Sequence, residues 1–330
     1  MAFDVAPTLP PRTAADRQRA DRITVRVNTS EAEWRDLMEA APAAHLPQDY
    51  SFAAGKRASG WPGRRLVLSS GDEPVAFAVV LEFQRLGVRL FNRVNRGPVL
   101  LDPAPTDEHV LGVYRALRNS VGRFWTAPLL IAPALHKTER NIALLREAGF
   151  IRRTDSSWRS GRIDISVSEQ ELWRSFGSTF RNRARAAERG GAVLRICDDA
   201  AGYEWMIARH VENMQTKGFS AAKPELLRGL RDAAPGNVLV FQLLDARVPV
   251  AGMSVVRFGH IAEYHVGWFG PEGRRLNAGN FLMWHVMREM KRRGVRTFDV
   301  GGLREGDGYT RFKRTMKPVE YELAGEWISL

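Results

Sequence analysis

The chain contains 330 residues, 44% of them hydrophobic and 26% charged, and this composition is that of a globular chain long enough for two domains of about 150 residues each. Its formal net charge of +12 predicts an anionic partner, which is a nucleic acid, a phosphorylated substrate or an anionic membrane surface. Cys197 is the only cysteine, so an internal disulfide and a multi-cysteine zinc site are excluded, and the lack of an apolar run of about 18 residues argues against a membrane-spanning helix.

The first half of the sequence reads as a polar lead followed by alternating strands and helices. Residues 1–20 lack the apolar segment of a signal peptide, so we expect a disordered lead and a cytoplasmic protein. Ser30 and Glu33 have the spacing of a capping box. Apolar runs and turn signals predict, in order, a strand (23–28), a helix from about residue 30, an antiparallel meander (64–102), a helix (107–122), a strand (127–135) and a helix (141–149).

The middle of the chain, residues 168–196, is rich in arginine. Ser168 and Glu171 fit a second capping box, and Gly177 is expected to split the segment into two helices. On the second helix the basic residues Arg181, Arg185 and Arg189 recur every four positions and share one face, opposite the apolar residues Phe180, Ala184 and Ala187. Arg183 lies off this ridge, towards the apolar side. Two interpretations stay open, a solvated amphipathic helix and a basic ridge that follows a phosphate backbone.

The second half repeats the order of the first. A meander (238–270) is followed by a helix (279–294), a strand (295–302) and a last meander from Tyr321 to the C-terminus. Pro74 and Pro249 occupy equivalent places, as do the pairs Gly97-Pro98 and Gly270-Pro271. A unit that occurs twice predicts two similar α/β domains with mixed sheets, at 21–160 and 161–330, and a ligand cleft between them. We also expect the C-terminal strands to be able to pack back onto the first domain.

Several catalytic motifs are missing from the sequence. It has no Gly-x-Ser-x-Gly elbow, no phosphate loop of the form G-x-x-x-x-G-K-[ST] and no dinucleotide-binding G-x-G-x-x-G after a strand. The seven histidines are scattered without metal-ligand spacing. The pattern therefore favours direct acyl transfer from an activated donor, in which the protein positions an amine and stabilises an oxyanion.

Four stretches carry a family resemblance that covers most of the chain. They read LPQDYSFAAGKRASGW (46–61), NRGPVLLD (95–102), FGSTFRNRARAAERGGAVLRI (176–196) and FDVGGLREGDGYTRFKRTMKP (298–318). In this order and spacing they resemble the FemABX peptidyltransferases, which are built from two tandem GNAT-type acyltransferase folds. The resemblance implies an enzyme that moves an amino acid from aminoacyl-tRNA to an amine, usually on a peptidoglycan precursor, with the charged tRNA as co-substrate and no cofactor.

The resemblance also implies roles for individual residues. Lys313, preceded by Phe312, matches the family lysine that neutralises charge at the transferred ester and the leaving ribose. Lys56, Lys217 and Lys223 match basic residues that hold an acceptor phosphate, and we add Arg183 to this group. The residues expected to bind tRNA are Arg181, Arg185, Arg189, Arg311 and Arg314. Asp102 and Asp299 are the carboxylates nearest these motifs; we take Asp102 as the candidate general base, and expect Asp299 to organise the turn that follows it.

The sequence departs from the family at one position and leaves the substrates open. An aromatic residue is expected about four positions after Lys223, where this chain has Leu227, and this weakens the prediction of a nucleotide-linked acceptor. Other acceptors are a small peptide, an amino sugar or a lipid amine, and we expect a monomer.

Two other functions remain possible on the sequence. An acyl-CoA-dependent N-acyltransferase of the GNAT superfamily would use the R-x-x-G-x-G/A turn, but Arg275 is followed by Ala278 and Asn280 in the glycine positions. A non-catalytic RNA-binding protein would use the arginine ridge, but exposed aromatic residues are not interleaved with it.

Overall fold

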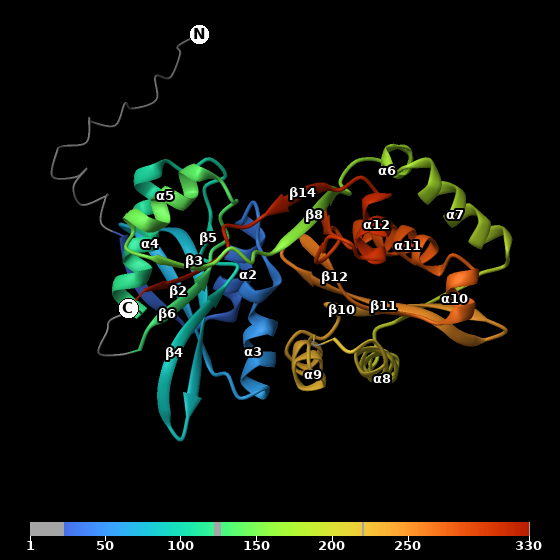
Figure 1. Ribbon diagram of the computed structural model, residues 1–330, viewed down its shortest axis with the longest axis horizontal. Coiled ribbons are helices and arrows are strands. Elements are labelled where there is room, and N and C mark those ends of the chain that lie inside the picture. The colour runs from blue at the N-terminus through green and yellow to red at the C-terminus, as the bar shows by residue number, and fades with distance from the viewer. Residues whose placement is uncertain (1–22, 122–126, 220, 330) are drawn as a thin grey trace, which may run out of the picture.

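The computed structural model describes residues 23–121, 127–219 and 221–329, so the predicted lead at 1–20 lies outside the described residues. Two sheets lie side by side, each covered by its own helices (Figure 1). No helix in these ranges is long and apolar enough to cross a membrane.

The first sheet has the order β1-β2-β3-β4-β6-β15-β7, with β5 beside β3. Its strands are β1 (Ile23–Asn28), β2 (Gly63–Ser70), β3 (Glu73–Arg85), β4 (Val88–Asn95), β5 (Val99–Leu100), β6 (Leu129–Ala132), β7 (Ile151–Thr154) and β15 (Glu326–Ser329). The helices of this half are α2 (Glu31–Ala40), η1 (Leu46–Gln48, a 3-10 helix), α3 (Tyr50–Ala58), α4 (Asp107–Val121) and α5 (Glu139–Glu147).

The second sheet, followed from its far edge, has the order β9-β10-β11-β12-β13-β8-β14. Its strands are β8 (Arg159–Asp164), β9 (Val193–Cys197), β10 (Val238–Asp245), β11 (Val248–Phe258), β12 (Ile261–Phe269), β13 (Thr297–Asp299) and β14 (Val319–Glu322). Its helices are α6 (Glu169–Ser175), α7 (Ser178–Arg189), α8 (Ala200–Lys217), α9 (Pro224–Ala233), α10 (Pro271–Arg275), α11 (Ala278–Arg292) and α12 (Gly308–Arg314).

The two sheets exchange one strand each. The strand orders of the two sheets correspond position by position. β4 and β6 form a parallel pair in the first sheet, and β12 and β13 form the parallel pair at the same positions of the second sheet. At the next position the first sheet holds β15, which pairs with β6 and β7. The second sheet holds β8 there, between β13 and β14. Each repeated unit thus gives its last strand to the other sheet, and in Figure 1 β8 and β14 run between the two halves.

This exchange corrects the predicted C-terminal meander. β14 belongs to the second sheet and β15 to the first, and the two strands do not pair with each other. The chain crosses at Gly325, whose φ is +86°, and a Cβ there would lie 2.7 Å from the carbonyl oxygen of Thr154. The other predicted strands and helices are found close to their expected places. The domain limits 21–160 and 161–330 stay a prediction. A single boundary at residue 160 places β15 in the second half, although its neighbouring strands β6 and β7 belong to the first sheet.

The middle hydrophobic core is shared by both halves. Buried residues of α2, α3 and the first sheet pack with buried residues of α8, α9 and the second sheet. The helices α3 and α9, which lie next to each other in Figure 1, meet through glycines. A Cβ built on Gly229 would lie 2.5 Å from the Cα of Gly55. The halves therefore touch backbone to backbone at this crossing.

The replacement Gly229→Ala tests this crossing. Alanine is favoured over glycine in a helix by about 1 kcal/mol, but here its methyl group forces α3 and α9 apart, so we expect the free energy of unfolding to fall by about 1–3 kcal/mol. Gly112→Ala in α4 is the control, because its Cβ would meet nothing closer than Ile23 at 3.4 Å. Denaturant unfolding measures both variants, and equal stability of the two would contradict the close approach.

Candidate functional site

A cavity of about 520 Å³ lies between the two halves. The first half contributes Phe52 and Lys56 from α3 and Arg96 from the turn after β4, while Trp158 comes from the segment that connects the halves. The second half contributes β12, the loop before α12, and Lys313 of α12 itself. The predicted cleft is therefore present, and it contains two of the predicted lysines.

Lys313 is the buried cation of this cavity. Its side chain is only 5% exposed, and its Nζ donates a hydrogen bond of 2.8 Å to the carbonyl oxygen of Gly302 and lies 5.0 Å from the ring centre of Tyr264. Burial lowers the pKa of Lys313 to about 8, although the nearby carboxylates Asp299, Asp307 and Glu263 oppose the shift. The ammonium is thus largely charged at neutral pH, yet can change its proton near that pH.

Asp299 organises the loop that receives Lys313. One carboxylate oxygen accepts hydrogen bonds from the Ser160 hydroxyl and from the Gly301 N–H at 2.9 Å. The other accepts from the Tyr321 hydroxyl at 2.7 Å and from Arg162 at 3.5 Å. Ser160 and Arg162 belong to β8 and Tyr321 to β14. The arrangement agrees with an organising role for Asp299, as expected from the sequence.

An ion pair joins the halves at the cavity wall. Arg96 donates to Glu263 of β12 at 3.1 Å, and its guanidinium lies 4.2 Å from the ring centre of Trp158. Burial raises the pKa of Glu263, because the charged form loses its hydration. Strand β12 has a bulge at His265, two residues after Glu263. Burial lowers the pKa of the His265 imidazole to about 4, so it is neutral at pH 7.

A second pocket, of about 620 Å³, opens beside the cavity. Arg183, Lys217 and Arg274 place three cations on it, and its floor is the start of α11 at Asn277–Asn280. Free N–H groups at a helix start attract anions. Asp307 and Tyr309 line both the pocket and the cavity, and Phe312 lines the pocket while its neighbour Lys313 lines the cavity. The two spaces therefore meet at the start of α12.

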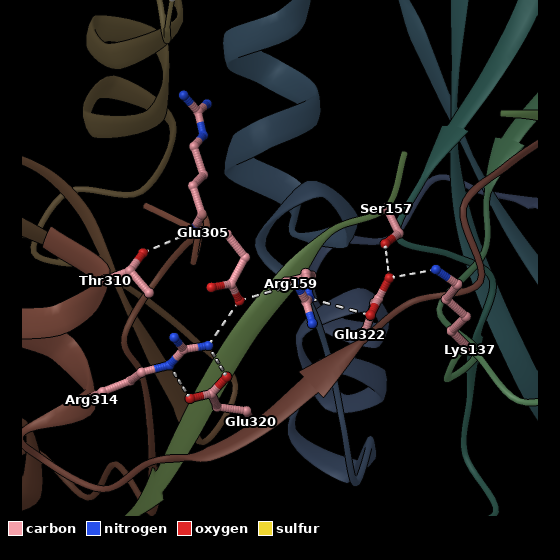
Figure 2. A network of polar contacts seen from close by, with 9 residues as sticks. Lys137, Ser157, Arg159, Glu305, Thr310, Arg314, Glu320 and Glu322 are labelled. Atoms are coloured by element: carbon pink, nitrogen blue, oxygen red, sulfur yellow. Dashed lines mark hydrogen bonds and ion pairs between the residues drawn. The ribbon is translucent and has the colours of Figure 1, made fainter. Parts of the chain in front are cut away.

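A network of charged residues holds the loop before α12 (Figure 2). Figure 2 shows Arg314 between Glu305 and Glu320, with Arg159 between Glu305 and Glu322. The network continues from Glu322 to Lys137 and Ser157, at 2.8 and 2.7 Å. The guanidinium of Arg314 is thus paired with two carboxylates, and its role as a tRNA contact stays a prediction.

The other predicted residues are not all brought to the site. Asp102 is exposed, accepts from the N–H of Ala104 at 2.8 Å and lines neither the cavity nor the pocket. This placement does not suit a general base. Arg181 donates to the carbonyl oxygens of Arg174 and Phe176 and so joins α7 to the end of α6, and its tRNA contact stays a prediction.

The remaining predicted cations lie partly where the sequence predicted and partly elsewhere. Arg185 lies over Trp173, and Arg189 and Arg311 are exposed. Arg183 is exposed at the pocket instead of facing the apolar side of α7. Lys217 also lies at this pocket, not with Lys56, whose pKa is lowered by burial and by the charges of Arg93 and Lys223.

Sequence reasoning missed the residues that are polar but lie within unremarkable segments. Arg274, Glu263 and Trp158 belong to segments that carry no motif of their own, and Asp307 lies within the 298–318 stretch without having been singled out. For Arg96 the sequence did contain a signal, because this residue lies in the NRGP stretch of the family resemblance. In the structure Arg96 has a φ of +51° and precedes a cis Gly97-Pro98 bond. Leu227, the departure from the family pattern, is fully buried in the middle core and faces neither space.

Comparison with known proteins supports this organisation. A family model described as an acetyltransferase (GNAT) domain matches residues 174–314. No curated protein matches the chain in sequence. A solved structure described as FemX aligns with a TM-score of 0.78 at 16% identity, over 93% of this chain and 97% of that one.

Two further solved structures share the arrangement. L-PGS from Bacillus licheniformis aligns with a TM-score of 0.55 at 11% identity, over 91% of both chains. A tandem GNAT protein from the clavulanic acid biosynthesis pathway aligns with a TM-score of 0.50 at 13% identity, over 93% of this chain and 98% of that one. At such identities the likeness establishes the fold. The predicted tandem GNAT fold and the FemABX-like architecture are confirmed, and residues 174–314 match the model of a GNAT domain.

Replacement of Lys313 by methionine tests the cost of the buried charge. Below pH 8 the Lys313 side chain holds its proton in both the folded and the unfolded chain. Because folding lowers the pKa of Lys313 from 10.5 to about 8, the charged lysine makes folding costlier by about 3 kcal/mol in this pH range. The cost fades as the pH rises from 8 to about 10.5, where the unfolded lysine also becomes neutral. Methionine removes this cost but leaves the Gly302 carbonyl without its donor, which costs about 1 kcal/mol.

We therefore expect Lys313→Met to raise the free energy of unfolding by about 1–2 kcal/mol at pH 7, with a smaller gain at pH 10. Lys317→Met, at an exposed lysine four residues later, should change stability little. Urea unfolding at the two pH values measures the effect. A loss of stability at pH 7 would show that the Lys313 ammonium stabilises the fold.

Proposed function

We propose that this tandem GNAT-type acyltransferase takes an amino acid from aminoacyl-tRNA and joins it to an amine held in the interdomain cavity. The observation that carries the proposal is the buried ammonium of Lys313 in the cavity, on the short helix α12 at whose start the cavity and the second pocket meet. The product is a peptide bond. We place the reaction in the cytoplasm, on a cell-wall precursor or small peptide, with a monomeric enzyme.

The chemistry needs a positive group where negative charge develops. When the acceptor amine attacks the ester carbonyl, charge builds on the carbonyl oxygen and then on the leaving ribose oxygen. The Lys313 ammonium, held by the Gly302 carbonyl, stabilises that charge from a buried position. With a pKa of about 8 it also has a proton to give to the leaving oxygen.

The attacking amine must first lose a proton. Glu263 and Asp307 are the carboxylates among the described residues that line the cavity. Burial raises the pKa of Glu263 towards the working pH, which suits a proton acceptor. Glu263 therefore replaces Asp102 as our candidate general base.

The second pocket suits the phosphate-bearing end of the donor. Its three cations and the start of α11 offer charge and N–H groups to phosphates. A CoA pyrophosphate would use the same chemistry, so the acyl-CoA enzyme remains the second candidate. Arg275, the arginine of the CoA turn, forms an ion pair with Glu272 and does not line this pocket.

Asp307 favours the aminoacyl donor over a simple acyl donor. It lies where the two spaces meet, so its carboxylate is available to the part of the donor that enters the cavity. An aminoacyl ester carries an α-ammonium beside its carbonyl group, and an acetyl thioester does not. The solved structures that share this fold also include one described as a putative lysylphosphatidylglycerol synthetase, with a TM-score of 0.53.

Lys313→Met should abolish most of the transfer. Loss of one oxyanion-stabilising donor costs about 100-fold or more in turnover, and the fold is retained by the argument above. Release and transfer of a radiolabelled amino acid from mixed aminoacyl-tRNA measures the effect, with Lys317→Met as the control. A Lys313→Met enzyme that transfers as fast as the parent would remove Lys313 from the mechanism.

Asp307→Asn tests the choice of donor. Asp307 also caps α12 through the N–H of Tyr309 at 3.0 Å, and asparagine caps helices equally well, so the change removes charge and keeps the cap. We expect the preference for aminoacyl-tRNA over N-acetylaminoacyl-tRNA to fall about tenfold. If Asp307→Asn acted only through the pKa of Lys313, it would affect both donors alike and leave this ratio unchanged. Asp199→Asn, at the cap of α8, is the matched control.

A further inference from the structure

The hairpin of β3 and β4 extends from the first sheet beyond the helices beside it (Figure 1). Its tip carries three apolar side chains within five residues, and Leu86, Val88 and Leu90 are 96%, 60% and 45% exposed. A single exposed apolar residue is ordinary on a protein surface, but a group at a projecting tip indicates a contact with another surface.

The internal repeat provides a comparison for this tip. The equivalent hairpin of the second sheet is β11–β12, and its turn is covered by α2 of the first half. A Cβ on Gly259 would lie 2.3 Å from the carbonyl oxygen of Met38, and the flanking Phe258 and Ile261 are buried. At the β3–β4 tip, a Cβ on Gly87 would meet no described atom within 4 Å. The same turn is therefore covered in one half and bare in the other.

Aromatic rings of the β3–β4 hairpin lie towards the interdomain cavity. Phe83 and Phe91 stack at 4.8 Å between ring centres, and Trp61 packs on both at 4.9 and 5.7 Å. The ammonium of Lys56, which lines the cavity, lies 6.0 Å from the ring centre of Trp61. An aromatic cluster therefore lies between the cavity wall and the β3–β4 tip that carries the exposed leucines.

Exposed cations lie beside this aromatic cluster and the tip, while the carboxylate of Glu82 is paired with Arg64 and Arg89. Arg57, at the end of α3, and Arg85, beside the tip, are exposed, and the whole chain carries a net charge of +12. Apolar side chains flanked by cations suit the interface of an anionic lipid bilayer, where the apolar groups enter the acyl boundary and the cations meet the headgroups.

We propose that the β3–β4 tip inserts into an anionic membrane surface and thereby brings the cavity, with Lys56, to an amine on a lipid-anchored acceptor. The acceptor part rests on the proposed aminoacyl transfer, but membrane binding does not. Binding is therefore measured without any donor, and its result stands apart from the outcome of the transfer assay.

The test is flotation of the whole chain with two kinds of vesicle, phosphatidylcholine alone and phosphatidylcholine mixed with phosphatidylglycerol. We expect binding to the mixed vesicles, weakened by salt. Leu86→Asn should reduce the partition coefficient about tenfold or more, since burial of a leucine side chain drives insertion. Asparagine also adopts the left-handed backbone of Leu86, whose φ is +50°, so the turn is kept.

The matched control is Val248→Asn, at a residue that is 60% exposed on a turn of the second sheet and distant in sequence from the tip. It should bind vesicles like the parent chain. No binding of the parent, or equal binding of Leu86→Asn and Val248→Asn, would overturn the proposal. A dimer in light scattering that Leu86→Asn dissociates would also overturn it, because the tip would then be an interface between two copies. Vesicle binding without aminoacyl transfer would leave the membrane-binding part standing and reject the proposed activity together with the acceptor part.

Discussion

The exchange of β8 and β15 between the sheets determines where the groups of the candidate site lie. Because β8 pairs with β13, Ser160 and Arg162 reach Asp299, and β14 adds Tyr321 from the other side. Asp299 in turn fixes the loop whose Gly302 carbonyl receives the Lys313 ammonium. The lysine is therefore positioned by strands that are joined to both halves, and the charged network of Figure 2 holds the same region from its outer side.

The buried setting of position 313, close to carboxylates, explains why this position holds a lysine and not an arginine. Arginine keeps its proton in almost any environment, whereas the pKa of lysine responds to burial. Most of the described ion pairs use arginine, which can bind a carboxylate with two nitrogens, as Arg228 does with Glu204 and Arg314 with Glu320. A buried lysine costs folding free energy, and such a cost is typical of a group kept for chemistry instead of stability.

Periodicity and turn residues predicted most of the fold, because each strand and helix depends on local patterns of apolar residues. The repeat of Pro74 and Pro249 correctly indicated two equivalent units. The strand exchange was not predictable, since β14 and β15 have the sequence of an ordinary hairpin and only the tertiary packing assigns them to different sheets. The site was predicted in part. Lys313 and Lys56 carry a motif, but the roles of Arg314 and Asp102 depend on side-chain partners that spacing does not reveal.

The most direct test of the account is a binding competition at moderate salt among aminoacyl-tRNA, deacylated tRNA and acetyl-CoA. The cavity and the pocket meet at Asp307 and Tyr309, and Lys313 lines the cavity, so the account predicts that the purified protein prefers charged tRNA over deacylated tRNA and binds acetyl-CoA weakly. Tight binding of acetyl-CoA with no preference for charged tRNA would contradict the account, and would make the chain an acyl-CoA-dependent N-acyltransferase.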